Sequence, residues 1–145
     1  MIVLENVTKK LGGSDVLKDI TFAIHPNEFV CITGPSGAGK STLMHLLIGA
    51  ERADAGQVNV DGVELRKVPK RALQVYRRRV GFVFQDYKLL WNRTVAENIA
   101  FPLEISGASD DVIKKRVKEL LKLMHLEKQA DTLCHALSGG EKART

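Results

Sequence analysis

A glycine-rich segment in the amino-terminal third of the sequence has the composition of a phosphate-binding loop. Gly34-Pro-Ser-Gly-Ala-Gly-Lys-Ser41 fits the pattern G-x-x-x-x-G-K-[ST] at every position. Glycines allow backbone N–H groups to turn inward around phosphate oxygens, and a following helix directs the positive end of its dipole at the same charge. We therefore expect a nucleotide phosphate site formed by Gly34, Pro35, Ser36, Gly37, Ala38, Gly39, Lys40, Ser41 and Thr42.

Three of these side chains have individual expected roles. Lys40 would hold the β- and γ-phosphates as a point charge, Ser41 would offer its hydroxyl to Mg²⁺, and Thr42 would bond a more distal phosphate oxygen. The simpler alternative is a glycine turn that does no more than begin a helix. The strand expected before the loop and the helix expected after it favour the phosphate site.

A second candidate anion site lies near the end of the sequence, at Leu137-Ser-Gly-Gly-Glu141. Ser138 and Glu141 have the spacing of an S-x-x-E capping box, so the segment would serve equally well as an ordinary helix start. A serine hydroxyl, the N–H groups of Gly139 and Gly140, and a helix dipole would also suit a γ-phosphate. The phosphate loop upstream favours this second interpretation.

The elements that must position the first loop are strands. Apolar residues alternate in two runs separated by Gly12-Gly13, which predicts two antiparallel strands joined by a glycine turn; they are Ile2, Leu4, Val7 and Ile20, Phe22, Ile24. His25-Pro-Asn-Glu28 predicts a tight turn, with Asn27 in the left-handed conformation. A buried strand over Phe29–Thr33 would then lead into the loop, and a helix would run from Ser41 to a glycine stop at Gly49.

The later elements change from strands to helices. Asp61-Gly62 predicts a hairpin between residues 57–60 and 63–65. A helix over 70–79 and a buried strand over 80–84 are expected to follow. Residues 94–105 and 109–126 predict two further helices, the second with Ser109 as its N-cap and an apolar face formed by Ile113, Val117, Leu120, Leu121 and Met124. The order indicates an α/β domain with a β-rich amino-terminal part and a helical subdomain.

The positive charge is concentrated in one segment. The chain has 145 residues, with 22 Lys plus Arg against 17 Asp plus Glu, for a net charge of +5. Seven of the cations lie between residues 66 and 79, where there is no acid; they are Arg66, Lys67, Lys70, Arg71, Arg77, Arg78 and Arg79. A solvated helix face, nucleic acid and anionic lipid are the alternatives. Because no aromatic residues alternate with these cations to stack bases, we expect no nucleic-acid partner.

Several protein classes are disfavoured by composition. With 44% hydrophobic residues the chain is not intrinsically disordered. Its apolar stretches fall short of the ~20 residues of a membrane helix, and Met1–Glu5 lacks a secretory signal, so the cytoplasm is the expected compartment. Cys31 and Cys134 are expected to be free, buried thiols, and the four histidines have no metal-ligand spacing.

In three motifs the sequence resembles the nucleotide-binding domain of ATP-binding cassette (ABC) transporters. The loop at 34–41, the Gln85 that closes Val80-Gly-Phe-Val-Phe-Gln, and the signature at 137–141 occur in the order of that family. The resemblance implies that ATP and Mg²⁺ bind at the loop and that Ser41 and Gln85 approach the metal. It also implies that one subunit's Ser138, Gly139, Gly140 and Glu141 complete its partner's ATP site in a head-to-tail homodimer. Without the resemblance, Gln85 would be a strand-end glutamine facing solvent.

Residues 84–100, with Gly107-Ala-Ser109 and Gly49–Arg52, are most similar to the cell-division branch of the family. Lipoprotein-release and macrolide-export ATPases share much of the pattern. This similarity implies a transmembrane permease as partner and a peripheral position on the cytoplasmic face of the membrane. Tyr87, Leu89, Leu90 and Trp91 form the candidate docking surface, with core packing as the alternative.

The sequence departs from the family at two positions and in extent. It has no aromatic residue near Lys10 and Leu11 to stack on adenine, which removes a contribution of about 1 kcal/mol to base selectivity. Cys134 stands where close relatives often carry proline, a change without an evident consequence. The family's later metal-binding aspartate, catalytic glutamate and switch histidine do not occur, so we expect a partial ABC domain that stops before the Walker B strand.

That partial domain is expected to comprise residues 1–85 (β-rich and phosphate-loop core), 86–137 (helical subdomain) and 138–145 (start of the signature helix), with no catalytic residue in the chain. Two functional hypotheses follow. A longer parent protein hydrolyses ATP, or the chain itself binds nucleotide without turnover. A small kinase using Asp86 on Mg²⁺ is a weaker alternative, because Gln85 and the signature both point to the ABC family.

Overall fold

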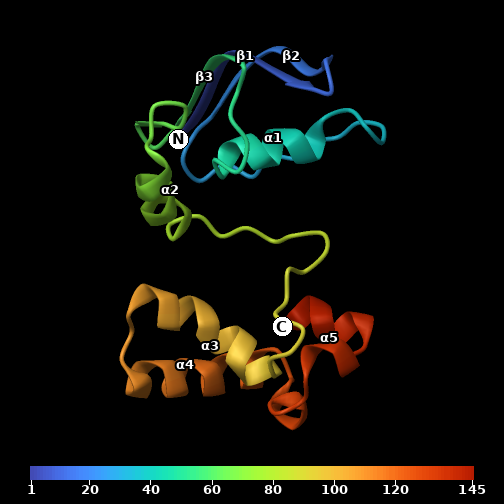
Figure 1. The fold of residues 1–145 in the computed structure, drawn as a ribbon, viewed down its shortest axis with the longest axis vertical. Helices are drawn as coiled ribbons and strands as arrows, with labels where there is room; N and C mark the ends of the chain where they lie inside the picture. The colour runs from blue at the N-terminus through green and yellow to red at the C-terminus, as the bar shows by residue number, and fades with distance from the viewer. The chain divides into compact units, whose positions relative to one another are not determined.

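The computed structural model describes residues 1–145, which form two compact units, residues 1–82 and 83–145 (Figure 1). The first unit contains β1 (Ile2–Leu11), β2 (Ser14–Ile24), α1 (Lys40–Leu47), β3 (Ala55–Val60), β4 (Val63–Glu64) and α2 (Lys70–Arg77). The second contains α3 (Val95–Ser106), α4 (Asp110–Leu123), the short 3-10 turns η1 (Glu127–Gln129) and η2 (Cys134–Ala136), and α5 (Gly139–Arg144). None of these helices is both long and apolar enough to cross a membrane.

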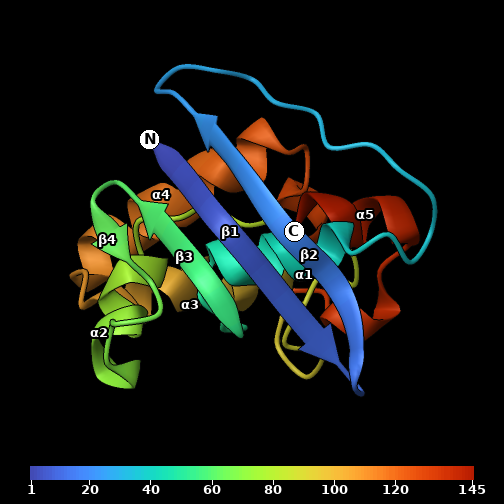
Figure 2. The same ribbon diagram turned by 90° about the horizontal axis from the view of Figure 1, so that it is seen from above.

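The strands of the first unit form one antiparallel sheet in the order β2-β1-β3-β4, which Figure 2 shows from above. Leu4 of the central strand β1 pairs with Phe22 of β2 and with Val58 of β3. One face of the sheet packs against α1 in a core formed by Leu4, Val7, Leu17, Leu43, Leu46, Leu47, Ala53, Val58, Leu65 and Leu73. Ile2 and Leu4 alternate onto this face, and an irregularity of β1 between Leu4 and Val7, where Asn6 has φ 50°, brings Val7 to the same core.

The predicted turns of the first unit are confirmed. Gly12 and Gly13, with φ of 58° and 85°, join β1 to β2. Asn27 has φ 66°, and the N–H of Glu28 donates to the carbonyl oxygen of His25 at 3.3 Å. Asp61-Gly62 connects β3 to β4 with φ of 49° and 79°, the backbone that a type I′ turn requires.

Two predicted strands are wrong. Residues 29–33 and 80–84 are not in strands, and Phe29 and Val83 are 96% and 94% exposed. Apolar character favours burial, but a strand forms only where another strand takes up its backbone N–H and C=O groups. No strand of the sheet pairs with either segment. For the same reason Cys31 is exposed rather than buried, whereas Cys134 is buried as expected.

The second unit is helical, as predicted, with small changes at the helix ends. Thr94 caps α3 through a complete capping box with Glu97. Ser109 occupies the N-cap position of α4, but its hydroxyl accepts no capping hydrogen bond. That helix ends three residues before the predicted Leu126, since His125 has a φ of 55° and stops the helical path. The core comprises Val95, Leu121, Leu126, Cys134 and Leu137.

Candidate functional site

Glycines shape the candidate phosphate loop before α1. Gly37 and Gly39 have φ of 81° and 85°, and Gly39 is the residue from which α1 starts. A Cβ added at Gly39 would lie 2.8 Å from both the Cδ2 of Leu17 and the carbonyl oxygen of Val16. Gly39 therefore meets two requirements together, a left-handed backbone and a close approach of the helix start to β2.

The loop is prepared for negative charge. The first turn of α1 contains no acidic residue, and the first N–H groups of a helix have no partner within it. Lys40 bends back over the loop, where its Nζ donates to the carbonyl oxygens of Gly34 and Pro35, both at 2.7 Å. The hydroxyl-bearing residues Ser41 and Thr42 follow in the same turn, Ser41 exposed and Thr42 half-buried. These donors, this dipole and this glycine cradle fit a polyphosphate with its bound Mg²⁺.

The far end of α1 is held by α2. The hydroxyl of Tyr76 donates to the carbonyl oxygen of Leu47. Arg77 donates to the carbonyl oxygens of Ile48 at 3.1 Å and Gly49 at 2.7 Å. These bonds satisfy carbonyl groups that a helix end leaves without an internal partner, and they place positive charge at the negative end of the dipole. Arg77 is therefore a structural cation, and α2 fixes the helix that begins at the phosphate loop.

Gln85 lies in the second unit, at an exposed turn that precedes two residues with left-handed backbone conformation. Tyr87 and Lys88 both have left-handed φ, 59° and 53°, a conformation that costs L-residues free energy. Lys88 forms an ion pair with Asp86 at 2.6 Å. The hydrogen bond from Lys88 lowers the pKa of Asp86, so this carboxylate already has a cationic partner within its own loop. That arrangement does not favour the kinase alternative.

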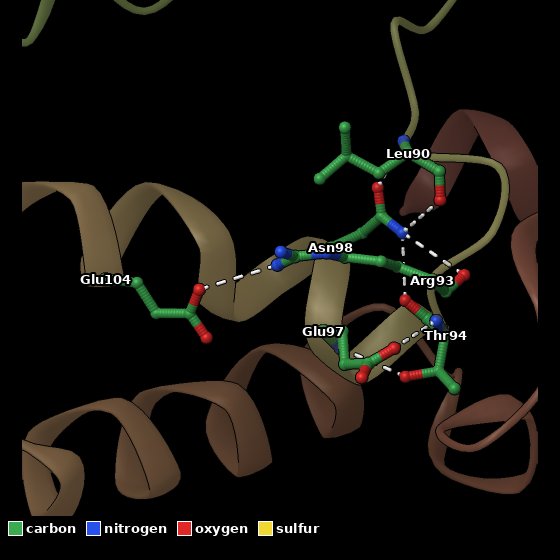
Figure 3. Close-up of polar contacts among 6 residues, drawn as sticks. All are labelled: Leu90, Arg93, Thr94, Glu97, Asn98 and Glu104. Carbon is green, nitrogen blue, oxygen red and sulfur yellow. Dashed lines mark hydrogen bonds and ion pairs between the residues drawn. The ribbon is translucent and has the colours of Figure 1, made fainter.

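Asn98 of α3 organises the loop that follows Gln85 (Figure 3). Its Oδ1 accepts from the backbone N–H of Leu90 at 2.7 Å. Its Nδ2 lies within donating distance of the carbonyl oxygens of Leu90 (3.1 Å), Thr94 (2.9 Å) and Arg93 (3.4 Å). One half-buried amide therefore closes residues 90–94 into a fixed turn before α3.

The capping box in Figure 3 holds the same turn from its other end. The N–H of Thr94 donates to Glu97 Oε2 at 2.7 Å, and the N–H of Glu97 donates to Thr94 Oγ1 at 3.2 Å. The backbone hydrogen bond from Thr94 lowers the pKa of Glu97. Arg93 also forms an exposed ion pair with Glu104 at 3.5 Å.

This turn is attached directly to the segment before the signature. The N–H of Cys134 donates to the carbonyl oxygen of Arg93 at 3.0 Å, and Asn98 Nδ2 donates to the Cys134 sulfur at 3.1 Å. Thr94 and Leu133 form an isolated antiparallel bridge. Burial raises the pKa of Cys134, which keeps this thiol neutral. A proline at 134 would lack the N–H that bonds Arg93, which gives this departure from related sequences a structural consequence.

The loop before α3 also contacts the signature helix α5. Lys142 of α5 lies over the ring of Trp91, 5.4 Å from its centroid, and His135 Nδ1 is 3.3 Å from the carbonyl oxygen of Trp91. Leu89 packs against the core of the unit. Of the predicted docking surface, Tyr87 and Trp91 are the exposed members, with exposed fractions of 41% and 45%.

Ser138 and Glu141 form the predicted capping box at the start of α5. The N–H of Ser138 donates to Glu141 Oε2 at 2.8 Å, and the Ser138 hydroxyl donates to the same oxygen at 2.6 Å. The Ser138 hydroxyl hydrogen bond lowers the pKa of Glu141. Gln129 donates to the other carboxylate oxygen at 3.0 Å. The ordinary helix-start interpretation is thus confirmed, while Gly139 and Gly140 remain a predicted phosphate contact.

The predicted site residues fall into two groups. Residues 34–42 lie together in the first unit, and Gln85 lies with residues 138–141 in the second. The sequence did not predict the roles of Asn98, which closes the loop before α3, and Arg77, which holds the end of α1. One signal for Asn98 was available, because asparagine is a poor helix former and its position inside a predicted helix requires a side-chain role.

Comparisons with known proteins agree on one family. The family model described as ABC transporter matches residues 17–145. The cell division ATP-binding protein FtsE of Escherichia coli (strain K12) is 43% identical over 145 residues, covering 99% of this chain and 65% of FtsE. The methionine import ATP-binding protein MetN of Geobacillus kaustophilus is 44% identical over 148 residues, covering 99% of this chain and 43% of MetN.

A solved structure agrees with the sequence matches. A dimeric, post-hydrolysis state of the ATP-binding cassette MJ0796, bound to ADP and Pi, superposes with a TM-score of 0.90 at 35% identity. The match covers 99% of this chain and 66% of that one. The chain therefore spans about two thirds of the length of its FtsE and MJ0796 relatives.

Proposed function

Because this chain belongs to the ABC transporter family and has the α/β P-loop NTPase fold of its nucleotide-binding cassettes, we propose that it binds ATP with Mg²⁺ through residues 34–42. The observation that carries the proposal is the glycine cradle, in which Gly39 brings the start of α1 against β2 and Lys40 covers the loop. When bound, Mg²⁺ neutralises phosphate charge and ATP supplies a transferable phosphoryl group.

Different residues of the loop would bind the phosphates and the Mg²⁺. Lys40 would exchange its bonds to Gly34 and Pro35 for bonds to the β- and γ-phosphates. Ser41 would hold Mg²⁺ with its hydroxyl, and Thr42 would bond a phosphate oxygen. By family resemblance, Gln85 would orient the metal and a water molecule. These roles are consistent with the absence of acid in the first turn of α1.

We infer further that ATP brings two copies together head to tail, with the signature residues of one copy at the other copy's ATP. Ser138, Gly139, Gly140 and Glu141 would act there. The MJ0796 cassette, solved as a dimer with ADP and Pi, supports this arrangement. In such a domain residues 1–85 form the core with its phosphate loop, 86–137 the helical subdomain and 138–145 the start of the signature helix.

In its biological setting, we propose that the protein hydrolyses ATP on the cytoplasmic face of the membrane and drives an FtsX-like transmembrane permease in cell division. The 43% sequence identity to FtsE over 145 residues supports this choice. The exposed Tyr87 and Trp91 are the proposed contact with that permease. A second candidate is the ATPase of another ABC importer or exporter, of the lipoprotein-release or macrolide-export type or a methionine importer, which the similar identity to MetN supports.

Residues 1–145 alone would bind nucleotide without turnover, because the family's catalytic glutamate and switch histidine do not occur among them. Phosphoryl transfer depends on such preorganised groups. Phosphate release by the 145-residue chain above the buffer background would refute this assignment.

The test of the nucleotide site is Lys40→Ala in the intact protein. We expect ATP affinity and turnover to fall by more than tenfold, because a charged phosphate ligand is lost. Lys18→Ala is the matched control, since Lys18 is exposed on β2 and has no proposed role. Unchanged ATP affinity and turnover in Lys40→Ala, or an equal loss in both variants, would overturn the proposal.

A further inference from the structure

The surface of α2 that faces away from its own unit is basic. Its inner side is formed by Leu73, which is buried, and by Tyr76 and Arg77, which bond the end of α1. The opposite side follows helical spacing and is exposed; it consists of Lys70, Arg71, Gln74, Val75 and Arg78. We call these five residues the basic face. Its cations point outward because the inner residues fix the rotation of the helix.

Two cations of this face, Lys70 and Arg71, form no ion pair in the structure. Between residues 66 and 79 there is no acid. Two acids line the same hollow as Lys70, Glu51 and Asp54, and both are already engaged. Glu51 pairs with Lys9 at 3.1 Å, and Asp54 accepts the backbone N–H of Lys10 at 2.6 Å.

An apolar side chain lies among these cations. Val75 is 62% exposed, between Arg71 and Arg78 on the same side of the helix. An isolated apolar residue within a basic helix face suits a headgroup layer, where the charges remain wet and the side chain enters the acyl boundary. A surface for single-stranded nucleic acid would use aromatic side chains to stack bases, yet the aromatic ring of this helix, Tyr76, turns inward to α1.

We propose that the basic face of α2 binds the anionic headgroups of a bilayer surface. The inference deepens the proposed function, because it rests on the proposed location at the membrane and supplies a lipid contact besides the permease. It does not depend on ATP hydrolysis. Each Lys or Arg near an anionic surface contributes to the attraction, and a cluster on an amphipathic helix is the typical arrangement.

The experiment measures sedimentation of the intact protein with vesicles of phosphatidylglycerol and phosphatidylcholine, and with phosphatidylcholine alone. We expect binding to the anionic vesicles only, weakened as salt rises. Lys70→Ala/Arg71→Ala should weaken it by about 30-fold, the effect of two cations at a charged surface. Lys114→Ala/Lys115→Ala, an adjacent pair of exposed lysines on α4, is the matched control and should bind as the parent does.

Two further measurements separate this inference from other outcomes. Lys70→Arg/Arg71→Lys keeps the charge and should retain vesicle binding. Binding of a fluorescent ATP analogue should be the same in all variants, which reports folding and the nucleotide site independently. Absent vesicle binding with normal ATP binding would overturn the lipid inference alone. Equal losses in both alanine pairs, or retention on duplex DNA or an acidic polypeptide in place of vesicles, would also overturn it.

Discussion

Replacing Asn98 by alanine should release the loop between Gln85 and α3. The two hydrogens of the Asn98 amide are shared among four acceptors within 3.4 Å. Three of these acceptors keep a second donor, because Arg93 N bonds Leu90 O, Cys134 N bonds Arg93 O, and Asn98 N bonds Thr94 O, at 2.9–3.0 Å. The N–H of Leu90 is different, since Asn98 Oδ1 at 2.7 Å is its acceptor.

The free-energy cost of Asn98→Ala is dominated by the lost acceptor of the Leu90 N–H. Leaving one partly buried N–H unsatisfied costs about 1–3 kcal/mol, and the carbonyl oxygens lose weaker, shared bonds. We expect Asn98→Ala to lower the free energy of opening this loop by about 2 kcal/mol, which is about 30-fold in the opening equilibrium. Asn98→Asp should be no better, because its second oxygen would face the carbonyl oxygens of Leu90 and Thr94.

The assay is hydrogen exchange of the Leu90 amide in the intact protein, which reports local opening whether or not the two units unfold together. The thiol of Cys134, buried beside Asn98, should react faster with a thiol reagent in the same variant. Asn92→Ala is the matched control, since Asn92 is an exposed asparagine of the same loop. Exchange at Leu90 that changes by less than about twofold, or equally in both variants, would refute the reasoning.

Two other predictions concern the candidate anion sites. Gly39→Ala should destabilise the protein by about 2–4 kcal/mol and weaken ATP binding, because it adds a contact at 2.8 Å to the backbone strain. Thermal unfolding would measure the loss of stability, with Gly37→Ala as the comparison, since that position has the same backbone strain but open space around it. Equal losses of stability in the two variants would contradict the prediction. Ser138 lowers the pKa of Glu141, so the stabilisation of α5 is complete above the ordinary glutamate pKa and is lost as pH falls through the lowered value. An NMR titration of Glu141 should show this low transition, and Ser138→Ala should move it upward; an unmoved transition would exclude the hydroxyl as its cause.

Features decided by neighbouring residues were predictable from the sequence. The turn at Asp61-Gly62 and the box between Ser138 and Glu141 depend on residues no more than three apart, so composition and spacing contain the information. The helix after the phosphate loop is also local, because its start follows from the glycines before it.

Features that depend on distant partners were not predictable. Residues 29–33 have the apolar character of a strand, yet no neighbouring strand pairs with them. Arg77 looks like any member of a basic run until its bonds to the end of α1 are seen, 28 and 29 residues away. Asn98 meets Cys134 across 36 residues. A single sequence does not show which distant residues are in contact, so the roles of these polar side chains cannot be identified from it.

The attachment of residues 91–94 to residues 133–142 limits how the length of this region can vary. Trp91, Arg93 and Thr94 each meet a fixed partner on the other segment. Adding or deleting one residue between Trp91 and Thr94 would change the spacing of these three residues, so they could no longer meet all three partners at once. The turn at Gly107, with φ 79° and open space around it, has no such partners. Insertions should therefore accumulate at the tip between α3 and α4, while the spacing between Trp91 and α3 stays constant.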